Sequence, residues 1–312
     1  MQEIGGYFEL ELQNGMHYHH DAIRLNTARN CFEYILKAKK YTKVYIPYYT
    51  CDVMLEPLHK LNIAYEFYHI NAHFEPLEDK ELQSNEAFLF TNYFGLKQEA
   101  VKRLAHVYTN QLIVDNAQAF FAAPLQGIDT FYSARKFFGV PDGAYLYSDS
   151  RLEIEEQDVS YDRMAHLLKR IDLGASSGYS DFQKNDEQLI GQPIKKMSKL
   201  TENMMCSLDY TKIIKQRRAN FIHLHAKLDA FNTFKLELEA EAVPMVYPFY
   251  GSEALRKKLI ENKIYTATYW PNVKEWCTKD SLEYQLTSDV IYLPVDQRYT
   301  TDDMDVIVKH LL

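Results

Sequence analysis

The sequence has little cysteine, no excess of positive charge and no long apolar run. Its four cysteines, Cys31, Cys51, Cys206 and Cys277, lie far apart without a CxxC pair, which is typical of reduced thiols in a cytoplasm. The formal net charge of −8 leaves no basic surface for a phosphate backbone, so nucleic-acid binding is not expected as the main role. No apolar run approaches the ~20 residues that span a bilayer.

The N-terminal sequence, MQEIGGYFEL, lacks a basic start and an apolar core, so we expect no signal peptide. His17, His19 and His20 have no cysteine or carboxylate at ligand spacing, which favours a polar N-terminal segment over a metal site. We therefore expect a soluble, cytoplasmic protein with no membrane or nucleic-acid partner and no metal.

The first half of the chain alternates strand-like and helix-like segments. A helix is predicted over 27–39, capped by Asn26, and another over 96–108. Such alternation predicts an α/β fold with a mainly parallel sheet covered on both faces. Ligands of these sheets bind at the carboxyl ends of the strands. The predicted strands are 43–47, 64–70, 86–92 and 111–116.

The second half has a different character. The stretch 151–174 is charged and reads as helical, and 195–231 predicts one long helix or two. Strands are predicted at 243–249, 264–270 and 289–295, with helices over 252–262 and from Thr300. At 312 residues the chain is long enough for two domains. We predict a large domain over 1–209 and a smaller C-terminal α+β domain over 210–312.

An acid and a lysine carry the strongest functional signal. Asp115 follows an apolar run in QLIVDNAQAF (111–120), and Lys136 follows an aromatic strand in DTFYSARKFFGVPDGAYLYS (129–148). Pyridoxal phosphate (PLP) needs an acid to keep its pyridine nitrogen protonated and a lysine to hold its aldehyde as a Schiff base. A strand-end Asp can equally form a turn, and a loop Lys can simply be solvated. However, a buried carboxylate requires a cationic partner, and a protonated cofactor ring would serve.

Several motifs, in this order, resemble the DegT/StrS family of PLP-dependent sugar aminotransferases, which have the aspartate-aminotransferase type of fold. The similar segments are RLNTARNCFEYIL, VDNAQAF, FYSARKFFGVPDGAYL, KKMSKLTENMM and the C-terminal ALRKKLIENKIYTATYWP with VIYLPVDQRYTTDDMDVIVKHL. The resemblance covers the chain from about residue 20 to its end. It implies a three-layer PLP-transferase fold and a homodimer with the 195–210 helix facing the partner.

The resemblance also implies roles for individual residues. Lys136 would hold the cofactor and shuttle a proton, Asp115 would pair with the pyridinium, and Gln118 would lie near the ring hydroxyl. The phosphate would lie at a helix N-terminus, where free N–H groups favour an anion. The residues assigned to that phosphate are Thr27, Ala28, Arg29 and Ser133.

The chain departs from the family pattern at three places. Ala28 and Arg29 replace the usual Gly and Thr of the phosphate segment, and Arg29 would offer a charged contact instead of a hydroxyl. Cys51 aligns with the aromatic residue that stacks on the cofactor, so Tyr48 or Tyr49 is the candidate ring. The asparagine expected before Met197, which would reach a partner's phosphate, is absent.

These residues lead to one main functional hypothesis and two alternatives. The main hypothesis is an aminotransferase that moves an amino group from a glutamate-like donor to a keto sugar, nucleotide-linked, in the biosynthesis of surface polysaccharides or related sugars. Donor and sugar come from the resemblance alone. The first alternative is a PLP-dependent lyase, racemase or other transferase. The second is a catalytically idle relative that keeps the fold.

Overall fold

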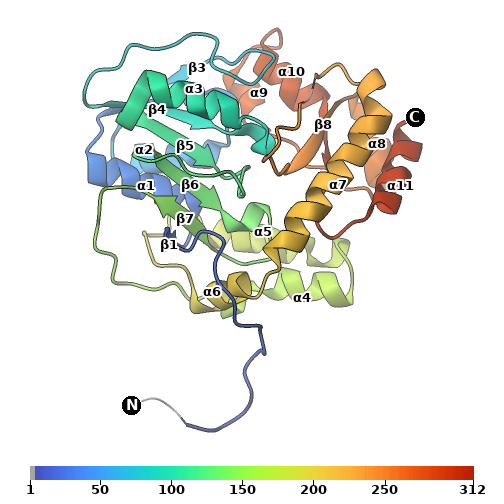
Figure 1. Cartoon of the computed structure of the whole chain (residues 1–312), viewed down its shortest axis with the longest axis horizontal. Helices are drawn as coiled ribbons and strands as arrows, with labels where there is room; N and C mark the ends of the chain where they lie inside the picture. The colour runs from blue at the N-terminus through green and yellow to red at the C-terminus, as the bar shows by residue number, and fades with distance from the viewer. Residues whose placement is uncertain (1–3, 236) are drawn as a thin grey trace.

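A seven-stranded sheet forms the centre of the larger part of the molecule (Figure 1). The computed structural model describes residues 4–235 and 237–312. The strand order is β1-β7-β6-β5-β4-β2-β3; the pairs from β3 to β6 are parallel, and β7 runs antiparallel to both β6 and β1. The predicted mainly parallel sheet is confirmed. The strands are β1 (Ile23–Leu25), β2 (Lys43–Pro47), β3 (Ala64–Tyr68), β4 (Glu86–Thr91), β5 (Leu112–Asn116), β6 (Asp129–Ser133) and β7 (Ala144–Tyr147).

Both faces of this sheet are apolar, because its strands are apolar on successive residues. In β4, Leu89 packs in one cluster with Phe32 and Ile35 of α1, whereas Phe88 and Phe90 pack on the opposite face in the cluster that holds Leu104 of α3. The sheet is therefore the middle of three layers, as predicted. The covering helices are α1 (Ala28–Lys39) and α2 (Leu55–Lys60) on the first face and α3 (Gln98–Tyr108) on the second.

The C-terminal part adds a two-stranded antiparallel sheet with helices beside it (Figure 1). The strand predicted over 264–270 is wrong: only Ala267 makes an isolated bridge, to Tyr292. The rings of Tyr269 and Trp270 instead pack against Tyr292 and Tyr49, respectively, so packing outweighs the β-propensity of this segment. The elements are β8 (Val246–Tyr250), β9 (Val290–Pro294), α8 (Glu253–Glu261), α9 (Val273–Trp276), α10 (Leu282–Asp289) and α11 (Thr301–Leu311).

Two helices, α6 (Lys199–Cys206) and α7 (Tyr210–Leu228), fill the stretch that was left open as one helix or two. Ser198 and Asp209 cap their N-termini by accepting hydrogen bonds from backbone N–H groups. The predicted domain boundary coincides with the break before α7, and the division into two domains stays a prediction.

The charged segment after β7 contains less helix than expected. Residues 151–160 are not helical, and α4 (Ala165–Asp172) begins only after a short 3₁₀ turn. It is followed by α5 (Tyr179–Gln188). Within the described part of the chain, no helix combines the length and the apolar character needed to cross a membrane.

The histidines near the N-terminus pack against the sheet and are not simply a polar segment. His19 is buried, and its Nε2 lies 2.7 Å from the carbonyl oxygen of Phe120, while His17 Nδ1 lies 2.7 Å from the hydroxyl of Tyr145. Burial lowers the pKa of both imidazoles to about 4. The neutral rings therefore anchor this segment across β6 and β7.

Candidate active site

The carboxyl ends of β1, β5 and β6 lie along one edge of the large sheet. Asp115 of β5 is paired in register with Phe131 of β6, two residues before Ser133. Ser133 and Leu25 both pair with Ala144, from opposite sides of β7. Because these strands run in the same direction, the segments that follow them emerge at the same edge. The sheet therefore brings the predicted acid, lysine and phosphate segments to one side of the molecule.

Asp115 is buried and has no ion pair among the residues that the structure describes. Its Oδ1 accepts a hydrogen bond from the backbone N–H of Ala117 at 2.8 Å. Burial raises the pKa of Asp115 from 3.8 to about 6, although the Ala117 N–H and the charge of Lys136 both oppose that rise. A protonated nitrogen placed beside this carboxylate would restore its normal ionisation.

Lys136 ends a short 3₁₀ turn, η4 (Ala134–Lys136), which directly follows β6. Its side chain is exposed, and it forms no ion pair or hydrogen bond within residues 4–235 and 237–312. Burial raises the pKa of both Asp115 and Cys51, and the positive charge of Lys136 opposes that rise in each. Lys136 thus lies within electrostatic range of Asp115, and its amine is open to a ligand.

The predicted phosphate segment begins α1, but its cap is Thr27 and not Asn26. Thr27 Oγ1 accepts a hydrogen bond from the N–H of Asn30 at 3.1 Å. The N–H groups of Ala28 and Arg29 precede the first intrahelical hydrogen bond, as at any helix start. The first turn contains no acidic residue. This helix start retains backbone donors that an anion can use.

The side chain of Arg29 is already engaged. Its guanidinium forms an ion pair with Glu56 Oε2 at 2.5 Å, and Glu56 Oε1 accepts a hydrogen bond from the N–H of Gly191. Arg29 therefore connects α1 to Glu56 of α2, and Glu56 in turn holds the loop that contains Gly191. The expected charged contact of Arg29 to a phosphate would require this ion pair to break.

Tyr49 does not fit its predicted role as a stacking ring. It is fully buried, its hydroxyl hydrogen-bonds that of Tyr292, and its ring packs edge-on against Trp270 at 5.0 Å. A ring with no accessible face cannot stack on a cofactor. By contrast, Cys51 is partly exposed and lies within the electrostatic reach of Lys136, which leaves that position open beside the site.

Gln118 is buried next to the turn that follows β4. Its Oε1 accepts a hydrogen bond from the N–H of Phe94 at 3.2 Å, and Phe94 has a positive φ of 59°. Gln118 thus supports an uncommon backbone conformation. Its expected position near a cofactor hydroxyl stays a prediction.

The sequence interpretation missed the role of Asp142, which lies in the Pro-Asp-Gly sequence 141–143 before β7. Asp142 is completely buried and accepts hydrogen bonds from Ser198 and Thr201 at the start of α6. An Asp in such a turn is ordinarily read as a turn former. Its partners, a backbone N–H and two hydroxyl groups more than 50 residues away in the sequence, gave no local signal.

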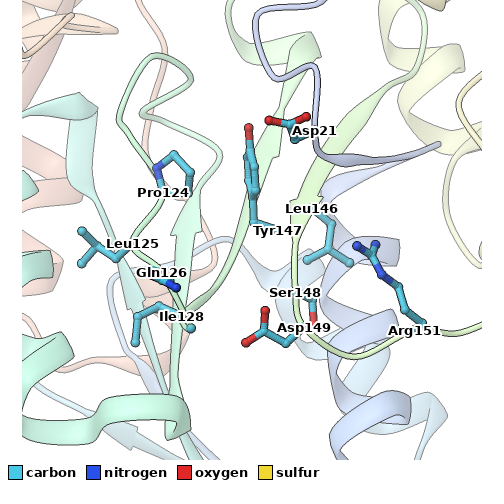
Figure 2. A pocket seen from close by; sticks show the side chains of 11 residues that line it. Asp21, Pro124, Leu125, Gln126, Ile128, Leu146, Tyr147, Ser148, Asp149 and Arg151 are labelled. Carbon is cyan, nitrogen blue, oxygen red and sulfur yellow. The ribbon is translucent and has the colours of Figure 1, made fainter.

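Two cavities lie away from this edge. The first, of about 360 Å³, is lined by Asp21, by residues 124–128, by the end of β7 with Tyr147, and by the segment that follows it, including Arg151 (Figure 2). It lies at the amino end of β6, opposite to Asp115. The second, of about 340 Å³, lies in the C-terminal part between Lys263, Tyr299 and α11. Neither cavity is lined by a predicted site residue.

Comparison with known proteins shows the fold. The chain is similar to DesV of S. venezuelae (TM-score 0.62, 14% identity, covering 93% of this chain and 83% of that one). It is also similar to a DegT DnrJ EryC1 StrS aminotransferase from Brucella abortus (0.61, 13%, 93% and 84%). A third similar structure is CalS13, a sugar aminotransferase from Micromonospora echinospora (0.57, 15%, 93% and 86%). No family model and no curated protein matches the chain. The chain therefore has the three-layer fold of the DegT/StrS-type sugar aminotransferases, as the sequence resemblance implied.

Proposed function

We propose that this protein is a PLP-dependent aminotransferase in which Lys136 carries the cofactor and Asp115 faces its ring nitrogen. One observation carries the proposal: Asp115, a buried carboxylate without an ion pair among the described residues, lies near the end of β5, beside the strand that leads into the exposed lysine of η4. Structures of the same fold include Spr1654 from Streptococcus pneumoniae, assigned as a sugar aminotransferase, in a PLP form and a PMP form.

The residues present suit this cofactor. When bound, PLP supplies a protonated ring that withdraws electrons from the carbon to which the amino group is attached. Asp115 stabilises that proton on the ring, because its own burial favours a cationic neighbour. Lys136 holds the cofactor through its amine and, once released, moves a proton at the reacting carbon. Ser133, Thr27 and the first N–H groups of α1 are the proposed phosphate donors.

The proposed acceptor is a keto sugar attached to a nucleotide, and the proposed donor is a glutamate-like amino acid, in the biosynthesis of surface polysaccharides or related sugars. Support comes from the sequence resemblance and from neighbours such as DesI, solved with its TDP-sugar product. A lyase, racemase or other transferase remains the alternative chemistry. Formation of the pyridoxamine form on addition of amino donors separates a transaminase from these.

A catalytically idle relative is less consistent with the site. A buried carboxylate without its ligand costs stability, and this chain keeps such a carboxylate at Asp115.

The domains proposed are 1–209 for binding of the cofactor and 210–312 for closure of the site.

We also propose a cytoplasmic homodimer. Lys136 is open to solvent in the single chain, and a second copy would cover it. Large apolar side chains are exposed on the neighbouring α4 and α5, namely Leu168, Ile171, Tyr179 and Phe182. Such a concentration is typical of a protein interface. The four free cysteines suit a reducing compartment.

The proposal is tested by identifying which lysine attaches the cofactor. Purified protein is incubated with PLP, reduced with borohydride and digested, and the modified peptide is identified by mass spectrometry. The label is expected on Lys136 and is expected to be lost in Lys136→Ala. Lys257→Ala is the matched control, because Lys257 is an exposed lysine on α8. Labelling of Lys136 no stronger than that of Lys257 would refute the proposal.

A further inference from the structure

The carbonyl group directly after Lys136 is held by two side chains from the C-terminal part of the chain. Phe137 O accepts a hydrogen bond from Gln297 Nε2 at 2.9 Å and another from Arg217 at 3.3 Å. Gln297 follows β9, and Arg217 belongs to α7. Two residues that lie far from Lys136 in the sequence thus reach the backbone of the turn that contains it, residues 134–137, which is called the lysine turn below.

Arg217 is an unusual side chain because it is fully buried without an ion pair among the described residues. Its guanidinium lies 4.5 Å from the centre of the Phe137 ring. It donates to Gln297 Oε1 at 2.8 Å and to the carbonyl oxygens of Pro244 and Met245 at 3.2 Å each. Four acceptors and an aromatic face therefore replace the water that this charge loses on burial.

Burial lowers the pKa of Arg217 to about 10, so the side chain remains charged at neutral pH. The carboxylate of Asp296, whose charge opposes this lowering, is engaged by Arg298 through contacts of 2.7 and 2.9 Å. A buried cation that faces carbonyl groups is costly to maintain. A purely apolar side chain would fill the same space without that cost, so the guanidinium must provide an interaction that an apolar side chain cannot.

The lysine turn is fixed at its other end by the sheet. Ser133 is paired with Ala144, and the N–H groups of Phe137 and Phe138 both bond to Ala134 O. The Phe137 carbonyl, just beyond Lys136, accepts its hydrogen bonds from Arg217 and Gln297. The turn therefore has one support from the large sheet and a second from the C-terminal part.

We propose that Arg217 and Gln297 are a positioning pair that fixes the backbone of Lys136. The position of the Lys136 amine then depends on how the C-terminal part packs against this turn. The role of the pair for Lys136 rests on the proposed function, whereas its effect on the turn does not. Both residues act on Lys136 through the carbonyl group of Phe137.

The first measurement uses the cofactor-free protein. Arg217→Lys keeps the charge but loses the fork of donors, and Gln297→Met keeps the volume but loses the donor. Both are expected to speed hydrogen exchange of residues 134–140 by about tenfold, as expected for loss of a hydrogen bond from a charged or amide donor. Arg218→Lys is the matched control, because Arg218 also lies on α7 and donates to the carbonyl oxygens of Glu239 and Ala242, not to Phe137.

The second measurement uses protein loaded with PLP. The pH midpoint of the visible absorbance is expected to shift by at least about 0.5 unit in Arg217→Lys and Gln297→Met, because the lysine nitrogen changes its position relative to Asp115. Arg218→Lys is expected to retain the wild-type midpoint. A merely structural loss of stability would lower the melting temperature of all three variants without moving the midpoint.

Equal exchange of 134–140 in Arg217→Lys, Gln297→Met and Arg218→Lys would overturn the proposal. An unchanged midpoint in loaded Arg217→Lys and Gln297→Met would overturn the positioning role. If wild-type protein never attaches PLP at Lys136, the proposed function fails, and the exchange measurement still decides whether the pair fixes the turn. If Arg217→Lys does not fold, Gln297→Met provides the same two measurements.

Discussion

Asp142 accepts two hydrogen bonds from Ser198, one from its backbone N–H at 2.8 Å and one from its hydroxyl at 2.7 Å. The Thr201 hydroxyl donates a third. Ser198 caps α6, and Asp142 lies in the turn that leads from Lys136 into β7. The loop that contains Lys136 and the start of α6, which are far apart in sequence, are therefore joined by one buried polar cluster.

Removal of this carboxylate should be costly. In Asp142→Ala the N–H of Ser198 and two hydroxyl groups lose their buried acceptor, so the free energy of unfolding is expected to fall by about 3 kcal/mol. Urea denaturation followed by circular dichroism measures the change. Asp280→Ala, at an exposed position, is expected to change stability by less than about 0.5 kcal/mol. Similar losses for the two variants would contradict the buried role of Asp142.

Asp115 should destabilise the empty protein in a pH-dependent way. Its pKa in the folded protein, about 6, lies above the ordinary 3.8, so the folded state binds this proton more tightly than the unfolded chain. The resulting cost is fully present above pH 6 and disappears as the pH falls towards 4. Asp115→Asn is therefore expected to stabilise the cofactor-free protein by up to about 3 kcal/mol at high pH.

Thermal denaturation at about pH 8 and about pH 4.5 checks this prediction. The stabilisation should be largest at the higher pH and small at the lower one, while the variant loses cofactor binding. Asp280→Asn serves as the control at an exposed site. A variant less stable than wild type at the higher pH would show that the carboxylate has a stabilising partner.

Cys51 offers a gain-of-affinity test. If this position faces the cofactor, as its alignment implies, Cys51→Phe would supply a stacking ring worth about 0.5–1.5 kcal/mol, which corresponds to a Kd for PLP lowered by about two- to tenfold. Equilibrium dialysis measures the Kd, with Cys277→Phe as the control. An unchanged Kd in Cys51→Phe would place this side chain away from the cofactor.

Arg29 should be a structural rather than a phosphate-binding residue. Arg29→Gln and Glu56→Gln break the same ion pair from opposite sides, so both are expected to lower stability by about 1 kcal/mol. Both should change the Kd for PLP by less than about threefold, whereas loss of a charged phosphate contact would weaken binding about tenfold or more. Weaker binding in Arg29→Gln alone would restore the original assignment to phosphate.

Several strands of the large sheet could be predicted because each is an apolar run bounded by polar residues, so that β2 agrees with its predicted range and β5 begins one residue after its predicted start. The side of the sheet that bears the site followed from the parallel order alone. The local sequence was therefore sufficient to predict elements whose position depends on the hydrophobic pattern of a short segment.

The errors arose where distant partners decide. Tyr49 resembled a candidate stacking ring until Tyr292, from β9, was found to cover it. The ion pair of Arg29 with Glu56, which lies on another helix, was likewise not visible in the local sequence, and the role of Arg29 toward phosphate stays a prediction. The segment 264–270 has strand-like composition, but its aromatic side chains pack into a cluster from both parts of the chain. Pairing of this kind is a property of the folded structure and not of any short window.

The antiparallel pairing of β6 with β7 has a consequence for how this protein can vary. Residues 134–143 connect two adjacent strands whose facing ends, Ser133 and Ala144, are directly paired. The connection is therefore a closed hairpin loop and not a crossover, and its length is fixed by neighbours on both sides. Insertions elsewhere on the surface would leave the amine in place, whereas a single residue added within this loop would displace it.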